Sequence, residues 1–170
     1  MKRIFVSIFI ISIALFASYG QSNKKAEKDS LMLVKFEKAL ATLETKDWVI
    51  IVDSYETQGG IFETNTDAAN FMSYEKDNVY LQGQIVAGNS NINKLEVSNY
   101  DQSTDKKGNV KITMQVRGFF ITAKVDISLN RKAGDYADVI ITPTKGSMKR
   151  FSGYVVPRSQ SKYFKRTGEI

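Results

Sequence analysis

Six carboxylates in the middle of this chain could do acid–base chemistry: Asp53, Glu56, Glu63, Asp67, Glu75 and Asp77. Hydrolysis of a glycosidic bond by carboxylates requires two of them on opposite sides of the bond, one of which its surroundings keep protonated. Spacing along the sequence brings no two of these residues to a working separation. The pattern therefore favours solvated loop charges, and a carboxylate-dependent hydrolase stays as a less favoured alternative.

Other catalytic chemistries lack their residues in this sequence. Histidine and cysteine are absent, which removes the commonest zinc ligands, His-based catalysis and disulfide bonds. The nucleophile motif Gly-x-Ser-x-Gly and phosphate-binding glycine loops are also absent. The short oxygen-rich stretches 65–67 and 101–105 supply too few ligands for calcium. We therefore expect no enzymatic activity, no catalytic residue, no metal site and no cofactor.

Aromatic residues form the second set that could act: Tyr74, Tyr80, Tyr100, Phe119, Phe120, Phe151 and Tyr154. Large rings with few polar groups are typical of pockets for apolar, lipid-like or glycan ligands. Aromatic residues at alternating strand positions more often pack in the core, and this interpretation is favoured for most of the set. Within it, Tyr80, Phe151 and Tyr154 are the candidate ligand-binding residues.

The first twenty residues have the order of a secretory signal. Lys2 and Arg3 precede an apolar run at 4–16, small residues at 17–20 and a polar stretch. The small residues predict cleavage between Gly20 and Gln21. An apolar run of thirteen residues is shorter than the roughly twenty that span a bilayer. We expect export to the periplasm or the extracellular space, with no stable membrane anchor after signal removal.

Residues 21–170 are enough for a single domain with a sizeable core. They contain 22 basic and 18 acidic residues, a net charge of +4, and these charges are spread along the chain. Neither the charge nor the predicted export favours a nucleic-acid partner. The partners we expect are a small apolar or glycan ligand bound by a non-enzymatic module, or a protein of the cell envelope.

One amphipathic helix is predicted over 24–45. Its apolar residues Met32, Phe36, Ala39 and Leu43 recur at steps of three and four, the spacing of one helix face. The favoured interpretation is a helix that covers one face or end of a sheet. A helix that binds a partner or a membrane surface is the alternative.

The rest of the chain has the pattern of strands. Apolar residues alternate with polar ones over 110–116 and 121–129, which predicts a hairpin with one buried face. Further runs at 48–55, 70–75, 79–85, 95–100, 136–142 and 148–156 are separated by turn-forming residues. We expect a mainly β fold, a single antiparallel sheet of about eight strands that closes into a barrel or sandwich. The basic C-terminal tail, 158–170, is predicted to be solvated, with a surface-binding arm as the alternative.

Three segments carry a resemblance to a known family. They are 108–116, 137–142 and the closing Arg150-Phe151-Ser152-Gly153-Tyr154. Together with the order of signal, helix, Trp-led strand and hairpins, they resemble the domain-of-unknown-function family numbered 4251 (DUF4251), a family of small exported proteins. The resemblance implies a compact β fold with no known activity. It therefore implies no site residues.

Overall fold

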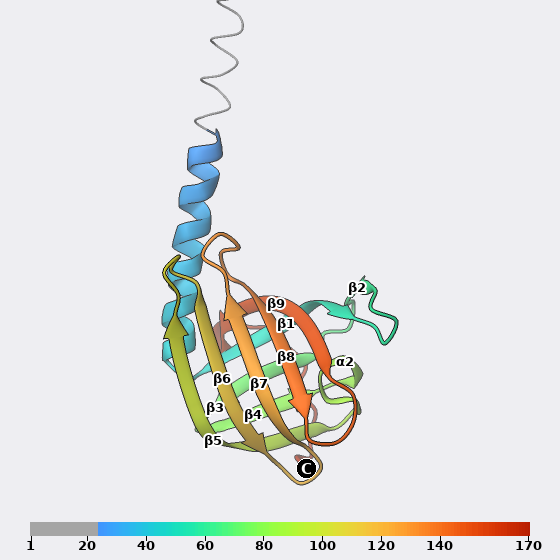
Figure 1. The fold of residues 1–170 in the computed structure, drawn as a ribbon. Helices are drawn as coiled ribbons and strands as arrows, with labels where there is room; N and C mark the ends of the chain where they lie inside the picture. The colour runs from blue at the N-terminus through green and yellow to red at the C-terminus, as the bar shows by residue number, and fades with distance from the viewer. Residues whose placement is uncertain (1–23) are drawn as a thin grey trace, which may run out of the picture.

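The computed structural model describes residues 24–170 (Figure 1). The predicted signal peptide and its cleavage position between Gly20 and Gln21 lie outside the described residues. A helix occupies 24–44, one residue shorter than predicted, and strands make up most of the chain after it. The prediction of a mainly β fold that follows one N-terminal helix is confirmed.

Eight antiparallel strands close into a barrel (Figure 1). In spatial order they run β1-β3-β4-β5-β6-β7-β8-β9, and β9 pairs back with β1. The structure therefore decides between the two predicted closures in favour of the barrel. The bounds of the strands are β1 Trp48–Glu56, β3 Phe71–Glu75, β4 Asn78–Gln82, β5 Ile92–Thr104, β6 Val110–Arg117, β7 Thr122–Leu129, β8 Tyr136–Pro143 and β9 Lys149–Pro157.

Closure depends on a close approach between β1 and β9. At Gly153 of β9, a Cβ atom would overlap the carbonyl group of Ile51 on β1, so this position accommodates only glycine. The register of the pair shifts between Val52 and Ser54, just after the last β1 residue that pairs with β3, Ile51. The short strand β2, Phe62–Thr64, pairs with the second half of β1 and adds a flap outside the barrel.

The barrel interior is filled by side chains from every strand of the barrel. Trp48, Tyr74 and Phe151 are its largest buried residues, and they belong to one continuous apolar cluster that also contains Met72 and Met114. The predicted alternation holds in β6 and β7, where every second residue faces this cluster. The barrel centre is thus a packed core made of the apolar positions that the sequence indicated.

The N-terminal helix packs with its second half against one end of the barrel. Phe36, Ala39 and Leu43 are buried in the core cluster, and Lys35 forms an ion pair with Asp135 in the β7–β8 turn at 3.6 Å. The first turns of the helix are exposed and project beyond the barrel (Figure 1). Within 24–170, no helix has the length and apolar character that crossing a membrane requires.

The C-terminal tail begins with the short 3₁₀ helix η1 Arg158–Gln160 and lies on the outside of the barrel, where most of its residues stay exposed. It crosses an apolar patch on the outer face of β1, β3, β4 and β5, where Tyr163 packs on Phe71 with ring centroids 4.5 Å apart. At its end, Ile170 exchanges backbone hydrogen bonds with Ile92 and Lys94 of β5, at 3.0 and 2.9 Å. Most residues of 158–170 are exposed, but the tail is docked and not frayed as predicted, because the outer face carries apolar residues that the tail covers.

Candidate functional site

The structure does not bring the three predicted aromatic residues together. Phe151 is fully buried in the barrel core. Tyr80 lies on the outer face under the C-terminal tail, where the Lys165 amine sits 3.7 Å from its ring centroid. Tyr154 is 42% exposed on the outside of the barrel and packs edge-on against Tyr136. None of the three lines the groove described below, so its residues differ from those that the sequence favoured.

The six candidate carboxylates form two groups: three lie on the paired strands β1 and β2, and three lie in or next to β3. Glu56 pairs with Arg150 at 3.4 Å, and Glu63 accepts a hydrogen bond from Tyr55 at 2.7 Å. Asp53 accepts a hydrogen bond from the Tyr136 hydroxyl at 2.9 Å. Glu75, Asp67 and Asp77 lie under the tail, in the loop before β3 and in the β3–β4 turn. Each carboxylate has different neighbours, and this arrangement gives the hydrolase alternative no support.

The end of the barrel opposite the N-terminal helix is covered by the very short helix α2, Gln84–Ala87. Its residue Val86 is buried in the core cluster. Gly83 precedes it with a φ of 95°, and a Cβ atom there would overlap the side-chain amide of Asn70. The Asn70 Oδ1 atom instead accepts a hydrogen bond from the Ile85 N–H at 3.1 Å. A glycine and a buried amide thus fix α2 on this end.

A groove of about 510 Å³ opens beside α2 at this end of the barrel. Its walls are α2 with the residues after it, the β6–β7 loop and the β8–β9 loop. We call it the end groove, and its lining residues are Leu81, Val86, Ala87, Gly88, Asn89, Phe119, Phe120, Ile121, Thr122, Ile141, Pro143, Thr144, Lys145, Gly146, Ser147 and Lys149.

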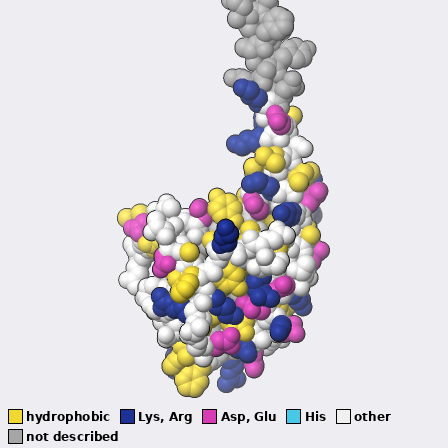
Figure 2. Space-filling view, turned by 180° about the vertical axis from the view of Figure 1, so that it is seen from behind, with side chains coloured by type: hydrophobic (Ala, Val, Ile, Leu, Met, Phe, Trp, Pro, Cys, Tyr) yellow, Lys and Arg dark blue, Asp and Glu magenta, His cyan; other side chains and the backbone are white. Residues whose placement is uncertain are grey.

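Two adjacent phenylalanines dominate the rim of the end groove. Phe119 is 83% exposed and Phe120 is 67% exposed, and their rings meet edge to face with centroids 4.6 Å apart. Figure 2 shows hydrophobic side chains protruding at the end of the molecule away from the helix. Two exposed phenylalanines beside a groove with a mixed polar and apolar lining are typical of a binding surface.

The loops that form the groove are tied to each other. Thr144 in the β8–β9 loop donates two hydrogen bonds to the Thr122 carbonyl at the start of β7, from its backbone N–H at 2.8 Å and from its hydroxyl at 3.2 Å. The Gly118 N–H donates to the Ile121 carbonyl at 2.7 Å and closes the β6–β7 loop. Two of the three walls are therefore held by hydrogen bonds, which favours a preformed groove.

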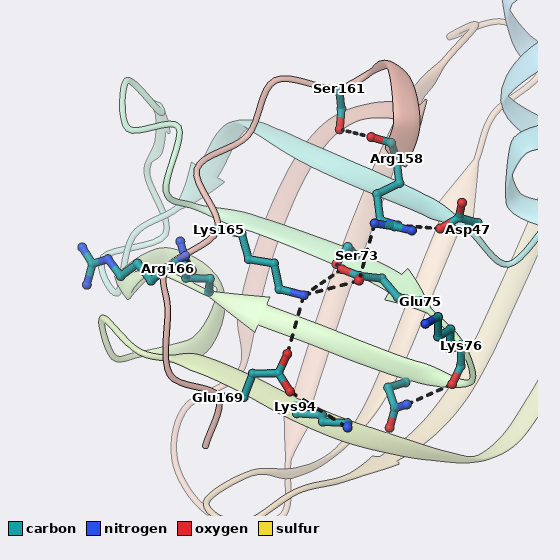
Figure 3. Close-up of polar contacts among 12 residues, drawn as sticks. Asp47, Ser73, Glu75, Lys76, Lys94, Arg158, Ser161, Lys165, Arg166 and Glu169 are labelled. Carbon is teal, nitrogen blue, oxygen red and sulfur yellow. Dashed lines mark hydrogen bonds and ion pairs between the residues drawn. The ribbon is translucent and has the colours of Figure 1, made fainter.

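A second cluster of charged and polar groups lies on the outer face under the tail (Figure 3). The Lys165 amine lies between Glu75 and Glu169, at 3.1 and 3.8 Å, and Arg158 donates to Asp47 at 2.6 Å. This hydrogen bond with Asp47 raises the pKa of Arg158. Ser73 donates to Glu75 at 2.9 Å but is fully buried, so a substrate cannot reach its hydroxyl. The geometry indicates that this cluster holds the tail in place.

Some groove residues carried a signal in the sequence. Phe119 and Phe120 belonged to the aromatic set, and they lie side by side in a tight connection between two alternating strands, where both cannot face the core. Neither was chosen as a candidate. Lys145, Lys149 and α2 were missed, because no local pattern distinguishes these two lysines from others or a four-residue helix from a turn.

The fold and groove together define a small closed β-barrel domain with a groove of mixed polar and apolar lining at one end. No protein-family profile matches the sequence, and no curated protein is similar to it. Among solved structures, the barrel is similar to the crystal structure of a DUF4251 family protein from Bacteroides eggerthii, with a TM-score of 0.64 and 23% sequence identity. The match covers 76% of this chain and 91% of the other. The resemblance predicted from the sequence is thus confirmed for the fold, and at this identity it shows the fold alone.

Proposed function

We propose that this protein is an exported, non-enzymatic binding module that takes an apolar ligand in the end groove. The observation that carries the proposal is the exposure of Phe119 and Phe120 at the rim of a groove whose floor includes buried Val86 and Ile141. Leaving two large rings in water forgoes about 1.5–3 kcal/mol of burial free energy for each. A ligand that covers both rings recovers part of that free energy.

The size of the groove supports a small ligand. Its volume of about 510 Å³ lies within the range of roughly 300–1,000 Å³ that small-molecule sites occupy. The apolar part of the lining comes from α2, the β6–β7 loop and β8, whereas hydroxyls of Thr122, Thr144 and Ser147 are also present. These hydroxyls leave a glycan-like ligand as the alternative within the same class.

A second candidate function is interaction with an envelope protein through the β2 flap. Ile61 and Phe62 are 66% and 52% exposed there, and β2 pairs with β1 alone among the described strands. A strand with one unpaired edge can accept a strand from a partner. The end groove is favoured because it combines exposed rings with a concave surface.

The test compares two variants with the wild type. The purified protein is incubated with a total lipid extract, and the retained ligand is measured by native mass spectrometry. In the Phe119→Ala/Phe120→Ala double variant, we expect at least about tenfold weaker retention, since each tenfold corresponds to about 1.4 kcal/mol. Phe62→Ala is the matched control, because it also removes a half-exposed ring but lies in the flap, and we expect it to retain ligand normally.

Two results would contradict the proposal. One is the absence of any retained ligand in the wild type. The other is equal retention by the wild type and the double variant, which would place binding outside the end groove. If Phe62→Ala instead abolishes cross-linking to an envelope protein while groove variants keep it, the second candidate function is favoured.

A further inference from the structure

The charge of the end groove distinguishes it from a purely apolar site. Its lining includes Lys145 and Lys149 and contains no aspartate or glutamate. Neither lysine belongs to an ion pair among residues 24–170, although Lys35, Lys94, Lys111, Lys124 and Lys165 each have a carboxylate partner there. The groove therefore presents two positive charges without a compensating negative charge of its own.

Lys149 is held at the groove and does not extend freely into solvent. It is half-buried, and its Cε and Nζ atoms lie against Gly88, 3.6 and 3.7 Å from where a Cβ atom of that residue would be. Its backbone belongs to β9, so the barrel fixes the base of the side chain. An amine packed against the groove wall loses less freedom when it binds an anion than a free surface lysine does.

The apolar and charged parts of the groove lie on different elements. Phe119 and Phe120 come from the β6–β7 loop, whereas Lys145 and Lys149 come from the β8–β9 loop and the start of β9. Hydrogen bonds between Thr144 and Thr122 join these two loops. A single ligand can therefore place a chain on the rings and an anionic group beside the amines.

We propose that the ligand of the end groove is an amphiphile in which an apolar chain carries one anionic group, a carboxylate or a phosphate. This inference rests on the proposed function and adds the chemical class of the ligand. The phenylalanines bind the chain, and the lysines bind the anion through charge-assisted hydrogen bonds. Because the anion partly leaves water when it binds, these bonds contribute more than exposed ion pairs do.

The experiment compares probes that differ in the head group. Binding of palmitate, of the neutral alcohol hexadecanol and of palmitoyl lysophosphatidate is measured by displacement of a fluorescent fatty acid at low ionic strength. We expect palmitate to bind at least about tenfold more tightly than hexadecanol, the effect of about 1.4 kcal/mol. Tighter binding of palmitate would identify a free carboxylic acid as the source of the anion. Tighter binding of lysophosphatidate would identify a phosphate head group.

Two charge variants complete the test. Lys145→Gln/Lys149→Gln is expected to reduce palmitate binding to the level of hexadecanol and to leave hexadecanol binding unchanged. The matched control Lys107→Gln/Lys132→Gln removes the same charge from the opposite end of the barrel and is expected to change neither. Circular dichroism and the unfolding midpoint of each variant show whether the barrel is intact.

The possible results separate the chemical class of the ligand from the proposed function. If palmitate and hexadecanol bind equally, and binding depends on Phe119 and Phe120 but not on the lysines, the anionic ligand is refuted while the proposed function stands. If the control variant weakens palmitate binding as much as the groove variant does, the anion is attracted by the net charge of the protein and not by the groove lysines. The inference then fails. If no probe binds, the proposed function fails with it.

Discussion

Gln82 connects the C-terminal tail to the barrel, and its replacement tests whether the tail is held by specific hydrogen bonds. The side chain is fully buried on β4. Its Nε2 atom donates to the carbonyls of Ala69 at 3.0 Å and Phe164 at 2.6 Å, and its Oε1 atom accepts from the Arg166 N–H at 2.7 Å. Gln82→Leu keeps a side chain of similar size and removes all three hydrogen bonds.

The expected effect has two parts. The two bonds to the tail contribute about 0.5–1.5 kcal/mol each, so the equilibrium between a docked and a released tail shifts by about 1–3 kcal/mol, or roughly 5- to 150-fold. In the variant, the Ala69 carbonyl also loses its hydrogen bond from residue 82. This loss lowers the free energy of unfolding by about 1–3 kcal/mol. We therefore expect a less stable protein whose tail opens far more often.

Limited trypsin digestion measures the release, because the tail contains Arg158, Lys162, Lys165 and Arg166. When opening is fast, the rate of cleavage follows the population of the open state. Intact-mass spectrometry follows loss of the C-terminal peptides, and urea unfolding follows global stability. The control is Gln84→Leu, since this neighbouring glutamine is exposed. Equal cleavage rates in Gln82→Leu and the wild type would refute the specific role of the amide.

Two further substitutions test the electrostatics. Burial is the main cause that raises the pKa of Tyr100 to about 12, and within 24–170 its hydroxyl has no hydrogen-bond partner. The folded protein therefore loses stability as the pH rises from about 10, the ordinary tyrosine value, to about 12, and Tyr100→Phe should remove this part of the loss without destabilising the protein at pH 7. An unchanged decline of the urea midpoint above pH 10 would contradict this. Burial opposes ionisation of Asp126, but hydrogen bonds from Lys124, Thr113 and Lys111 outweigh it and lower the pKa of that carboxyl below its ordinary value. Stability linked to Asp126 is thus present above pH 3.8 and lost as the pH falls through the lowered pKa, and Asp126→Asn should show a shallower acid decline, with a cost of about 0.5–1 kcal/mol near pH 7 because the lysines are half exposed. Urea midpoints from pH 2.5 to 7 check it, and parallel curves for variant and wild type would reject it.

Much of the fold follows from local pattern. In β6 and β7 the period of two is uninterrupted, so the sequence predicts the strands, their buried face and the turn between them. Barrel closure does not follow from local pattern, because it depends on pairing between β1 and β9, about 100 residues apart in sequence. Gly153 allows that pairing, yet a glycine in a strand reads equally as a bulge or a bend.

The docking of the tail does not follow from local pattern either. Its basic residues are typical of solvated termini, and nothing near it in sequence shows what it covers. The apolar patch beneath it consists of Val49, Phe71, Tyr80 and Ile92, which come from four different strands and lie on the face opposite the core. In β3 and β4 four of five residues are buried, and such continuous burial indicates strands covered on both faces. Such burial requires an element that covers the outer face, but it does not identify the C-terminal tail as that element.

The two ends of the barrel are covered by unequal elements, and this difference locates the candidate site. At one end, the second half of a long helix buries Phe36, Ala39 and Leu43 in the core. At the other end, the four residues of α2 bury Val86 and leave a groove beside it, with Phe119 and Phe120 exposed at its rim. Because burial of apolar surface is what stabilises a small barrel, an end that keeps two exposed rings forgoes stability that the fold could have gained. A ligand that covers those rings would supply the missing contact, and the proposed binding function is therefore assigned to the end covered by α2.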